Sequence, residues 1–152
     1  VAFDLAKSAP AINHTVWPGR LESFVGRPPL LLDGAHNPAG AKALRTYLKD
    51  TTTRYVLVFG AMRDKHVREM AAEIFPAARL VIATRVRMTR AATTAFLAEI
   101  ANRLGKTVVE EPSITRALSK AKRLARPGET VVVAGSLYLV GAVRKRLIET
   151  NR

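Results

Sequence analysis

The chain has 152 residues, which is enough for one domain with a single core and too few for two ordinary domains. It contains no cysteine, which excludes disulfides, thiolate metal sites and cysteine nucleophiles, and no apolar run approaches the roughly 20 residues of a membrane-spanning helix. The net charge of +13 attracts anions without specifying which anion.

The predicted elements alternate along the chain. Segment 22–25 predicts an antiparallel strand, and segment 29–33 a strand that leads into a helix with Ala41, Leu44 and Leu48 on one face. Apolar segments 55–60, 80–83, 107–110 and 130–134 predict further strands. Apolar residues at helical spacing between them predict helices around 67–74, 92–104 and 114–121. A last helix covers 137–150, with Arg144, Lys145 and Arg146 near its end, where cations suit the helix dipole.

This alternation predicts the fold class. Strands separated by helices pair in parallel through right-handed crossovers, so we expect an α/β, three-layer, Rossmann-like fold. Its mostly parallel sheet has five or six strands, with helices on both faces. Ligands of such sheets bind beyond the carboxyl ends of the strands. We therefore expect loops 33–38, 60–66 and 135–136 to open onto one edge.

Several familiar signatures are absent. Gly34 and Gly40 are one residue too far apart for a P-loop, and no Gly-Lys-Ser/Thr follows them. The chain lacks the G-x-G-x-x-G dinucleotide fingerprint and any G-x-S-x-G elbow around Ser136. His14, His36 and His66 do not have the spacing of zinc ligands.

The polar residues after the strands have two interpretations each. Asp33 can reach a ribose or cap a helix, whereas Asn37-Pro38 favours a cap followed by a first-turn proline. Asp64 can cap a helix that starts near Lys65. Ser136 is expected to expose a hydroxyl and backbone N–H groups that suit an anion. Residues 17–20 predict a rigid turn that presents Arg20.

The basic residues are spread thinly, without a long Lys/Arg block and with few aromatic residues between them. This pattern favours a solvated surface over a nucleic-acid face, and a basic nucleic-acid-binding module stays as the alternative from a different class. The start at Val1 without a signal-peptide pattern indicates a fragment, and with the lack of cysteine it favours the cytoplasm. We expect neither nucleic acid nor membrane as a partner.

Four motifs occur in order: W-P-G-R-L-E at 17–22, L-D-G-A-H-N-P at 32–38, F-G-A-M-R-D-K at 59–65 and G-S-L-Y-L-V at 135–140. In order and spacing they resemble the carboxy-terminal domain of folylpolyglutamate and dihydrofolate synthases, in the Mur ligase superfamily, over about residues 16–148. The family usually has Asp-Lys-Asp where this chain has Asp64-Lys65-His66. Residues 16–152 are expected to form this domain, and residues 1–15 to be the end of an interdomain linker.

The resemblance implies an ATP-dependent acid–amino-acid ligase. The γ-phosphoryl group of ATP goes to a carboxylate of the folate (dihydropteroate or tetrahydrofolate), and the amine of L-glutamate attacks the acyl phosphate. The phosphate loop, the Mg²⁺ ligands and a modified lysine belong to the family's amino-terminal domain, which is the expected partner in cis. This chain alone is therefore expected to be inactive.

The resemblance also assigns roles to five residues. Arg20 is directed at the nucleotide, Asp33 accepts from the ribose or orients Arg20, and Lys65 supports the phosphates. His36 and Ser136 face the acyl phosphate or the glutamate. A peptidoglycan-precursor or cyanophycin ligase is the alternative within the superfamily, although segments 17–22 and 135–139 favour the folate branch. Dihydrofolate synthesis and polyglutamylation are not separated by the sequence.

Overall fold

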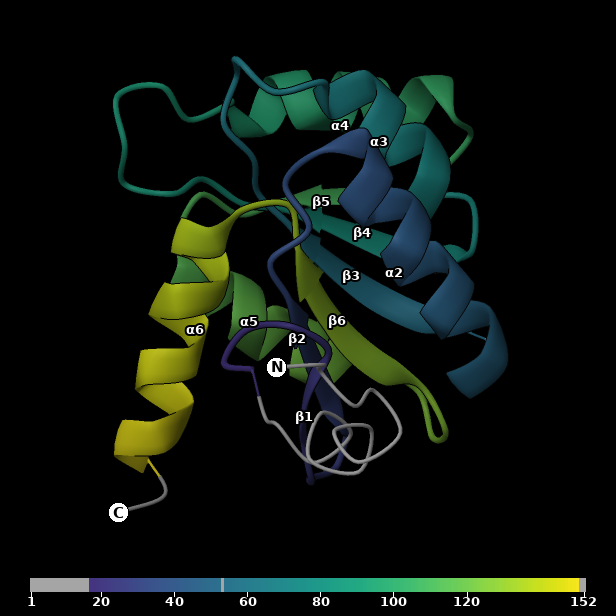
Figure 1. The fold of residues 1–152 in the computed structure, drawn as a ribbon, viewed down its shortest axis with the longest axis vertical. Helices are drawn as coiled ribbons and strands as arrows, with labels where there is room; N and C mark the ends of the chain where they lie inside the picture. Colours follow the sequence, from purple (N-terminus) through teal and green to yellow (C-terminus); the bar gives the residue numbers. More distant parts are fainter. Residues whose placement is uncertain (1–16, 53, 151–152) are drawn as a thin grey trace, which may run out of the picture.

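The computed structural model describes residues 17–52 and 54–150, so the linker expected at 1–15 lies outside the described residues. The described chain forms one sheet of six strands in the order β1-β2-β6-β3-β4-β5, with helices on both faces (Figure 1). The strands are β1 (Glu22–Phe24), β2 (Leu30–Asp33), β3 (Tyr55–Phe59), β4 (Ala78–Ala83), β5 (Val108–Glu110) and β6 (Thr130–Ala134).

Strand pairing confirms the predicted three-layer α/β class. β2, β6, β3, β4 and β5 pair in parallel with their sheet neighbours, and β1 pairs antiparallel with β2. The antiparallel strand predicted at 22–25 is thereby confirmed, one residue shorter, since its pairing with β2 ends at Phe24 and the exposed Val25 follows it. β6 lies between β2 and β3, so the last strand of the chain occupies the middle of the sheet.

Five helices cover the sheet in the described ranges. Helices α2, α3 and α4 lie on one side, and α5 and α6 lie on the other (Figure 1). Their bounds are α2 (Pro38–Thr51), α3 (Val67–Ile74), α4 (Thr94–Arg103), α5 (Ile114–Leu124) and α6 (Leu137–Thr150). None of these helices is long and apolar enough to cross a membrane.

The core has two halves because successive strand residues face opposite sides of the sheet. Leu57 and Phe59 pack with the buried faces of α2, α3 and α4, where the Phe59 and Phe75 rings meet edge to face at 5.0 Å between centroids. Val56 and Val58 pack with α5 and α6. Burial on both faces explains why the sequence of β3 is continuously apolar rather than alternating.

The ends of helices α3, α4 and α6 differ from three of the sequence-based expectations. The helix expected over 92–104 is shorter, because Thr93 caps α4 by accepting a hydrogen bond from Phe96 N at 3.2 Å. Asp64 caps nothing, since α3 begins at Val67 and Asp64 pairs with Arg90 at 2.7 Å. The last turn of α6 contains no basic residue, so the helix dipole does not account for Arg144, Lys145 and Arg146.

Candidate functional site

The loops that follow β2, β6 and β3 meet at the carboxyl edge of the sheet, as the motif positions predict. Gly135 N donates to Ala35 O at 3.0 Å, and Gly60 N donates to Ala134 O at 3.4 Å. Gly135 has a φ of 110°, and a Cβ atom built there would lie 2.7 Å from Gly60 O. Only glycine fits this conformation at this distance, so the close approach of the loops depends on it.

The turn that carries Arg20 is fastened to the β2 loop. Arg20 N donates to Trp17 O at 3.0 Å, which closes the turn, and Gly34 N donates to Gly19 O at 2.7 Å. Leu21 has a φ of 45°, a conformation that is unfavourable for a leucine. The contacts around the turn hold the backbone in this shape, with the exposed Arg20 side chain at its tip.

Asp33 supplies one of these contacts. Its Oδ2 accepts a hydrogen bond from Leu21 N at 3.0 Å, and its Oδ1 accepts one from Ala35 N at 2.9 Å. The carboxylate therefore joins the end of β2 to the turn that bears Arg20. Of the two roles considered for Asp33, this geometry suits a partner that positions Arg20 through the backbone. The residue is half-buried at the rim of the sheet and is not enclosed in the core.

Arg20, Asp33 and His36 line one cleft of about 390 Å³ at this rim. His36 Nδ1 lies 2.8 Å from Gly34 O. Because a carbonyl oxygen can only accept, Nδ1 carries the proton and donates it. In the neutral imidazole, Nε2 is then the nitrogen with the lone pair, which can accept a hydrogen bond or a proton from a ligand.

Asn37 is the predicted helix cap. Its Oδ1 accepts a hydrogen bond from Gly40 N at 2.7 Å, and Pro38 begins α2. The cap fixes α2 directly after the His36 loop, so the amino-terminal end of the helix opens towards the cleft that Asn37 and Gly40 also line.

Ser136 and Lys65 are placed differently from the other site residues. Ser136 is only 3% exposed, and its Oγ accepts a hydrogen bond from Tyr138 N at 3.1 Å. The expectation of an exposed hydroxyl is therefore wrong, because the hydroxyl oxygen accepts the hydrogen bond of a backbone N–H group at the start of α6 instead. Lys65 is exposed in the bend between β3 and α3 and is not among the residues that line the Arg20 cleft.

Glu22 and Arg144 are supporting residues that the sequence analysis did not identify. Glu22 accepts hydrogen bonds from Gly19 N at 2.7 Å and from Arg144 Nε at 2.9 and 3.0 Å. The pair joins the Arg20 turn to α6. Glu22 belongs to the W-P-G-R-L-E motif, which is a usable signal, but no local pattern points to a partner 122 residues away.

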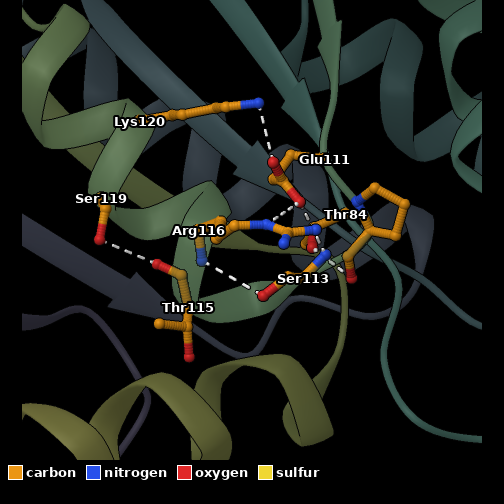
Figure 2. Close-up of polar contacts among 8 residues, drawn as sticks. Thr84, Glu111, Ser113, Thr115, Arg116, Ser119 and Lys120 are labelled. Carbon is orange, nitrogen blue, oxygen red and sulfur yellow. Dashed lines mark hydrogen bonds and ion pairs between the residues drawn. The ribbon is translucent and has the colours of Figure 1, made fainter.

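A second polar cluster follows β5 at the same carboxyl edge (Figure 2). The buried Glu111 pairs with Lys120 Nζ at 2.8 Å and with Arg116 Nε at 3.0 Å, and it accepts a hydrogen bond from Ser113 N at 3.2 Å. The hydrogen bonds from Lys120 and Arg116 lower the pKa of Glu111 to about 2. The carboxylate thus stays ionised and fixes the start of α5.

The described residues contain no group of three or more His, Asp or Glu side chains that could hold a metal ion. Divalent cations such as Mg²⁺ prefer carboxylate and phosphate oxygens. Asp33 has both oxygens engaged by backbone N–H groups, and Glu22 is engaged by Arg144.

Comparison with known proteins gives matches to ligases of folate metabolism. The family model described as Mur ligase, glutamate ligase domain, matches residues 19–137. A probable bifunctional folylpolyglutamate synthase/dihydropteroate synthase of Haloferax volcanii is 35% identical over 135 residues, which cover 88% of this chain and 16% of that protein. A dihydrofolate synthase/folylpolyglutamate synthase of Bacillus subtilis is 32% identical over 133 residues, which cover 86% of this chain and 30% of that protein.

A solved structure agrees with these relatives. The folylpolyglutamate synthase of Mycobacterium tuberculosis, complexed with ADP and AMPPCP, superposes with a TM-score of 0.84 at 28% identity. The superposition covers 95% of this chain and 35% of that one. The chain thus spans about a third or less of the length of the proteins that it matches.

Proposed function

Because the chain belongs to the Mur ligase, glutamate ligase domain family, we propose that it is the carboxy-terminal domain of a folylpolyglutamate/dihydrofolate synthase. The parent enzyme uses ATP to join L-glutamate to a folate, dihydropteroate or tetrahydrofolate, through an acyl phosphate. Residues 16–152 are the domain, residues 1–15 are linker, and the parent acts in the cytoplasm. The observation that carries the proposal is the shared cleft of Arg20, Asp33 and His36.

In this proposal Arg20 binds the nucleotide. Its exposed side chain lies at the tip of a turn that is held by Asp33 and Glu22, and among the described residues it has no hydrogen-bond or ion-pair partner. A guanidinium group held this way offers several N–H donors to phosphate oxygens. Asp33 acts mainly as a positioning residue, and the second lone pairs of its oxygens can still accept from a ribose hydroxyl.

His36 is proposed to act on the glutamate. With Nδ1 donating to Gly34 O, the Nε2 lone pair can accept a hydrogen bond from the incoming amine. The neutral amine then attacks the acyl carbon, the amide bond forms, phosphate leaves, and the proton that the amine loses passes to His36 Nε2. Ser136 contributes only by holding the start of α6, since its buried hydroxyl accepts a hydrogen bond from Tyr138 N. Lys65, exposed beyond β3, supplies positive charge towards the phosphates from outside the cleft.

The amino-terminal domain is proposed to close over this edge and to bring the Mg²⁺ ligands. Exposed apolar side chains on the Arg20 turn and the first turn of α6 support this contact, since Trp17, Leu21, Leu137 and Tyr138 are 61%, 40%, 51% and 58% exposed. Closure of a second domain would exclude water and position the phosphates, as phosphoryl transfer requires.

ATP binding to the 152-residue chain tests the proposal. We expect weak binding, with amide NMR shifts concentrated at Arg20 and in residues 33–37, and no ADP release with folate and glutamate present. Arg20→Gln should weaken ATP binding about tenfold, because a charged hydrogen bond to phosphate is lost. Arg123→Gln is the matched control, since Arg123 is exposed in the last turn of α5.

Equal affinity for ATP in the Arg20 and Arg123 variants would contradict the proposal, as would steady turnover by the chain alone. Nucleic-acid binding that is unaffected by ATP at physiological salt would support the basic binding module instead.

A further inference from the structure

A second hollow of about 510 Å³ lies on the α5 and α6 side of the carboxyl edge. Its walls are the loop after β4 (85–88), the start of α5, and the face of α6 from Tyr138 to Glu149. Figure 1 shows the loop after β4 reaching out beyond the sheet near the start of α6. We refer to this hollow as the basic groove.

Four cations and one carboxylate line the basic groove: Arg85, Arg87, Lys145, Arg146 and Glu149. Arg85 and Arg87 are exposed, and within 17–52 and 54–150 their side chains make no ion pair or hydrogen bond. Arg146 Nη1 donates only to the neutral Thr115 Oγ1 at 3.1 Å, and Lys145 reaches Glu149 only at 4.0 Å. The groove therefore presents positive charge that the described protein does not neutralise.

Two cations beside the groove differ from those that line it, because both form ion pairs with a buried carboxylate. Arg116 and Lys120 of α5 are both paired with Glu111 (Figure 2). Glu111 also holds Ser113 N, so one wall of the groove is fixed in place. Arg85 and Arg87 on the groove side have no such carboxylate partner among the described residues, and this local excess of positive charge points to an anionic ligand.

The groove also has an apolar component. Val86 and Leu118 are buried at 2% and 5% exposure, and Met88 is partly exposed at 36%. A ligand that fits must offer short apolar segments as well as repeated negative charges. A γ-linked glutamyl chain has this chemistry, because each unit contributes two methylene groups and one α-carboxylate. Nucleic acid fits less well, since Tyr138 is the single aromatic residue in the lining and base stacking needs more.

The groove lies close to the candidate site along α6. Tyr138, which lines the groove, is two residues from Ser136. The side chain of the intervening Leu137 packs closely against Gly34, which lines the cleft. The start of α6 thus separates the His36 loop from the groove. An elongated ligand that occupies both hollows would have to pass this helix start.

We propose that the basic groove binds the γ-glutamyl tail of a folate that already carries several glutamates. The inference rests on the proposed function, since a growing glutamyl chain exists only if the parent adds glutamate to folate. Each addition lengthens the tail by one carboxylate, and the groove holds the earlier units while the terminal unit occupies the site near His36.

Binding of free tetra-γ-glutamate to the 152-residue chain tests the inference. We expect tetra-γ-glutamate to bind at least about tenfold more tightly than glutamate, because several ion pairs form together. Amide shifts should appear at 85–88 and in α6. Arg85→Gln/Arg87→Gln should weaken this binding about tenfold, whereas Arg103→Gln/Arg123→Gln removes the same charge elsewhere and should leave it unchanged.

Equal loss of tetra-γ-glutamate affinity in both double variants would overturn the inference, because general electrostatic attraction would then explain the binding. Tighter binding of single-stranded DNA than of tetra-γ-glutamate through Arg85 and Arg87 would also overturn it. ATP binding is measured on the same samples. A chain that binds ATP through Arg20 but not tetra-γ-glutamate refutes the groove alone, and a chain that binds neither refutes the proposed function.

Discussion

At Gly135 the chain passes from the central strand β6 into α6 with a φ of 110°, against the carbonyl oxygen of Gly60. A side chain at this position meets backbone, which cannot rotate out of the way. Gly105 also has a positive φ, 66°, but a Cβ atom there has nothing within 4 Å. A substitution at Gly105 therefore tests backbone strain alone, whereas a substitution at Gly135 tests backbone strain together with a steric clash.

We expect Gly135→Ala to lower the free energy of unfolding by about 3 kcal/mol, because left-handed strain and a backbone clash add together. Gly105→Ala should cost about 1 kcal/mol, from strain alone. Urea denaturation of both variants measures the difference. Similar losses in the two would mean that the loops after β3 and β6 can separate easily, and would weaken the account of the carboxyl edge.

The ion pairs of Glu111 predict how the free energy of unfolding depends on pH. Its folded pKa is about 2, against an ordinary value of 4.5, because Lys120 and Arg116 stabilise the ionised form. A carboxyl whose pKa is lowered by folding contributes stability that is complete above the unfolded pKa. The contribution is lost as pH falls from about 4.5 through about 2.

Glu111→Gln should therefore flatten the decline in unfolding free energy between pH 5 and about 2 relative to the parent chain. Urea denaturation across this pH range gives the slopes. The neighbouring Glu110 is exposed, so Glu110→Gln should keep the steep decline and serves as the control. Identical slopes for Glu111→Gln and the parent would refute the assigned cause.

Single residues also mark where sequence reasoning reached its limit. The Asn37 cap was predictable because capping chemistry is local, and an Asn-Pro pair before an apolar helix indicates it. The buried hydroxyl of Ser136 was not predictable, since a glycine-serine turn is compatible with a hydroxyl that points either outwards or towards the next helix. The hydrogen bond from Leu21 N to Asp33 was not predictable either, because it joins two segments that lie 12 residues apart in the sequence.

At the scale of elements, the Glu22–Arg144 pair connects β1 and its turn to α6. The carboxylate is 10% exposed, and both of its oxygens accept from Arg144 Nε, so the pair should be coupled more strongly than an ordinary surface pair. A double-mutant cycle with Glu22→Gln and Arg144→Gln should give a coupling free energy of about 2 kcal/mol.

The Lys145–Glu149 pair provides the control cycle, because it lies on the same helix, spans 4.0 Å and is exposed on both sides. Its coupling should stay below about 0.5 kcal/mol. Both cycles are measured by urea denaturation. Equal couplings would show that the Arg20 turn is not held by α6.

Element positions followed closely from the sequence. The predicted strand 130–134 and helix 137–150 coincide with β6 and α6, because a continuous apolar run and a Gly-Ser turn delimit them. The predicted helix 67–74 coincides with α3, whereas the hypothesis that Asp64 caps a helix starting near Lys65 was wrong, because Asp64 pairs with Arg90 in the loop after β4. The role of Asp64 was thus determined by a contact between two loops that are distant in sequence, which local patterns do not indicate.

For the whole molecule, alternation of strands and helices was sufficient to predict a mostly parallel three-layer fold. The order of strands was not accessible, because β6 enters between β2 and β3 through pairings that no local pattern encodes. That insertion brings the loops at 33–38, 60–66 and 135–136 together. Alternation therefore indicated the carboxyl edge, and the four ordered motifs indicated which residues along it belong to the candidate site.

The two outer strands of the sheet, β1 and β5, have three residues each. Only a short row of main-chain donors and acceptors is thus left available at either border of the described sheet. A neighbouring molecule has little to extend by strand addition, which is a common route to aggregation for open sheets. We therefore expect strand addition at these borders to contribute little to self-association when the domain is concentrated for spectroscopy.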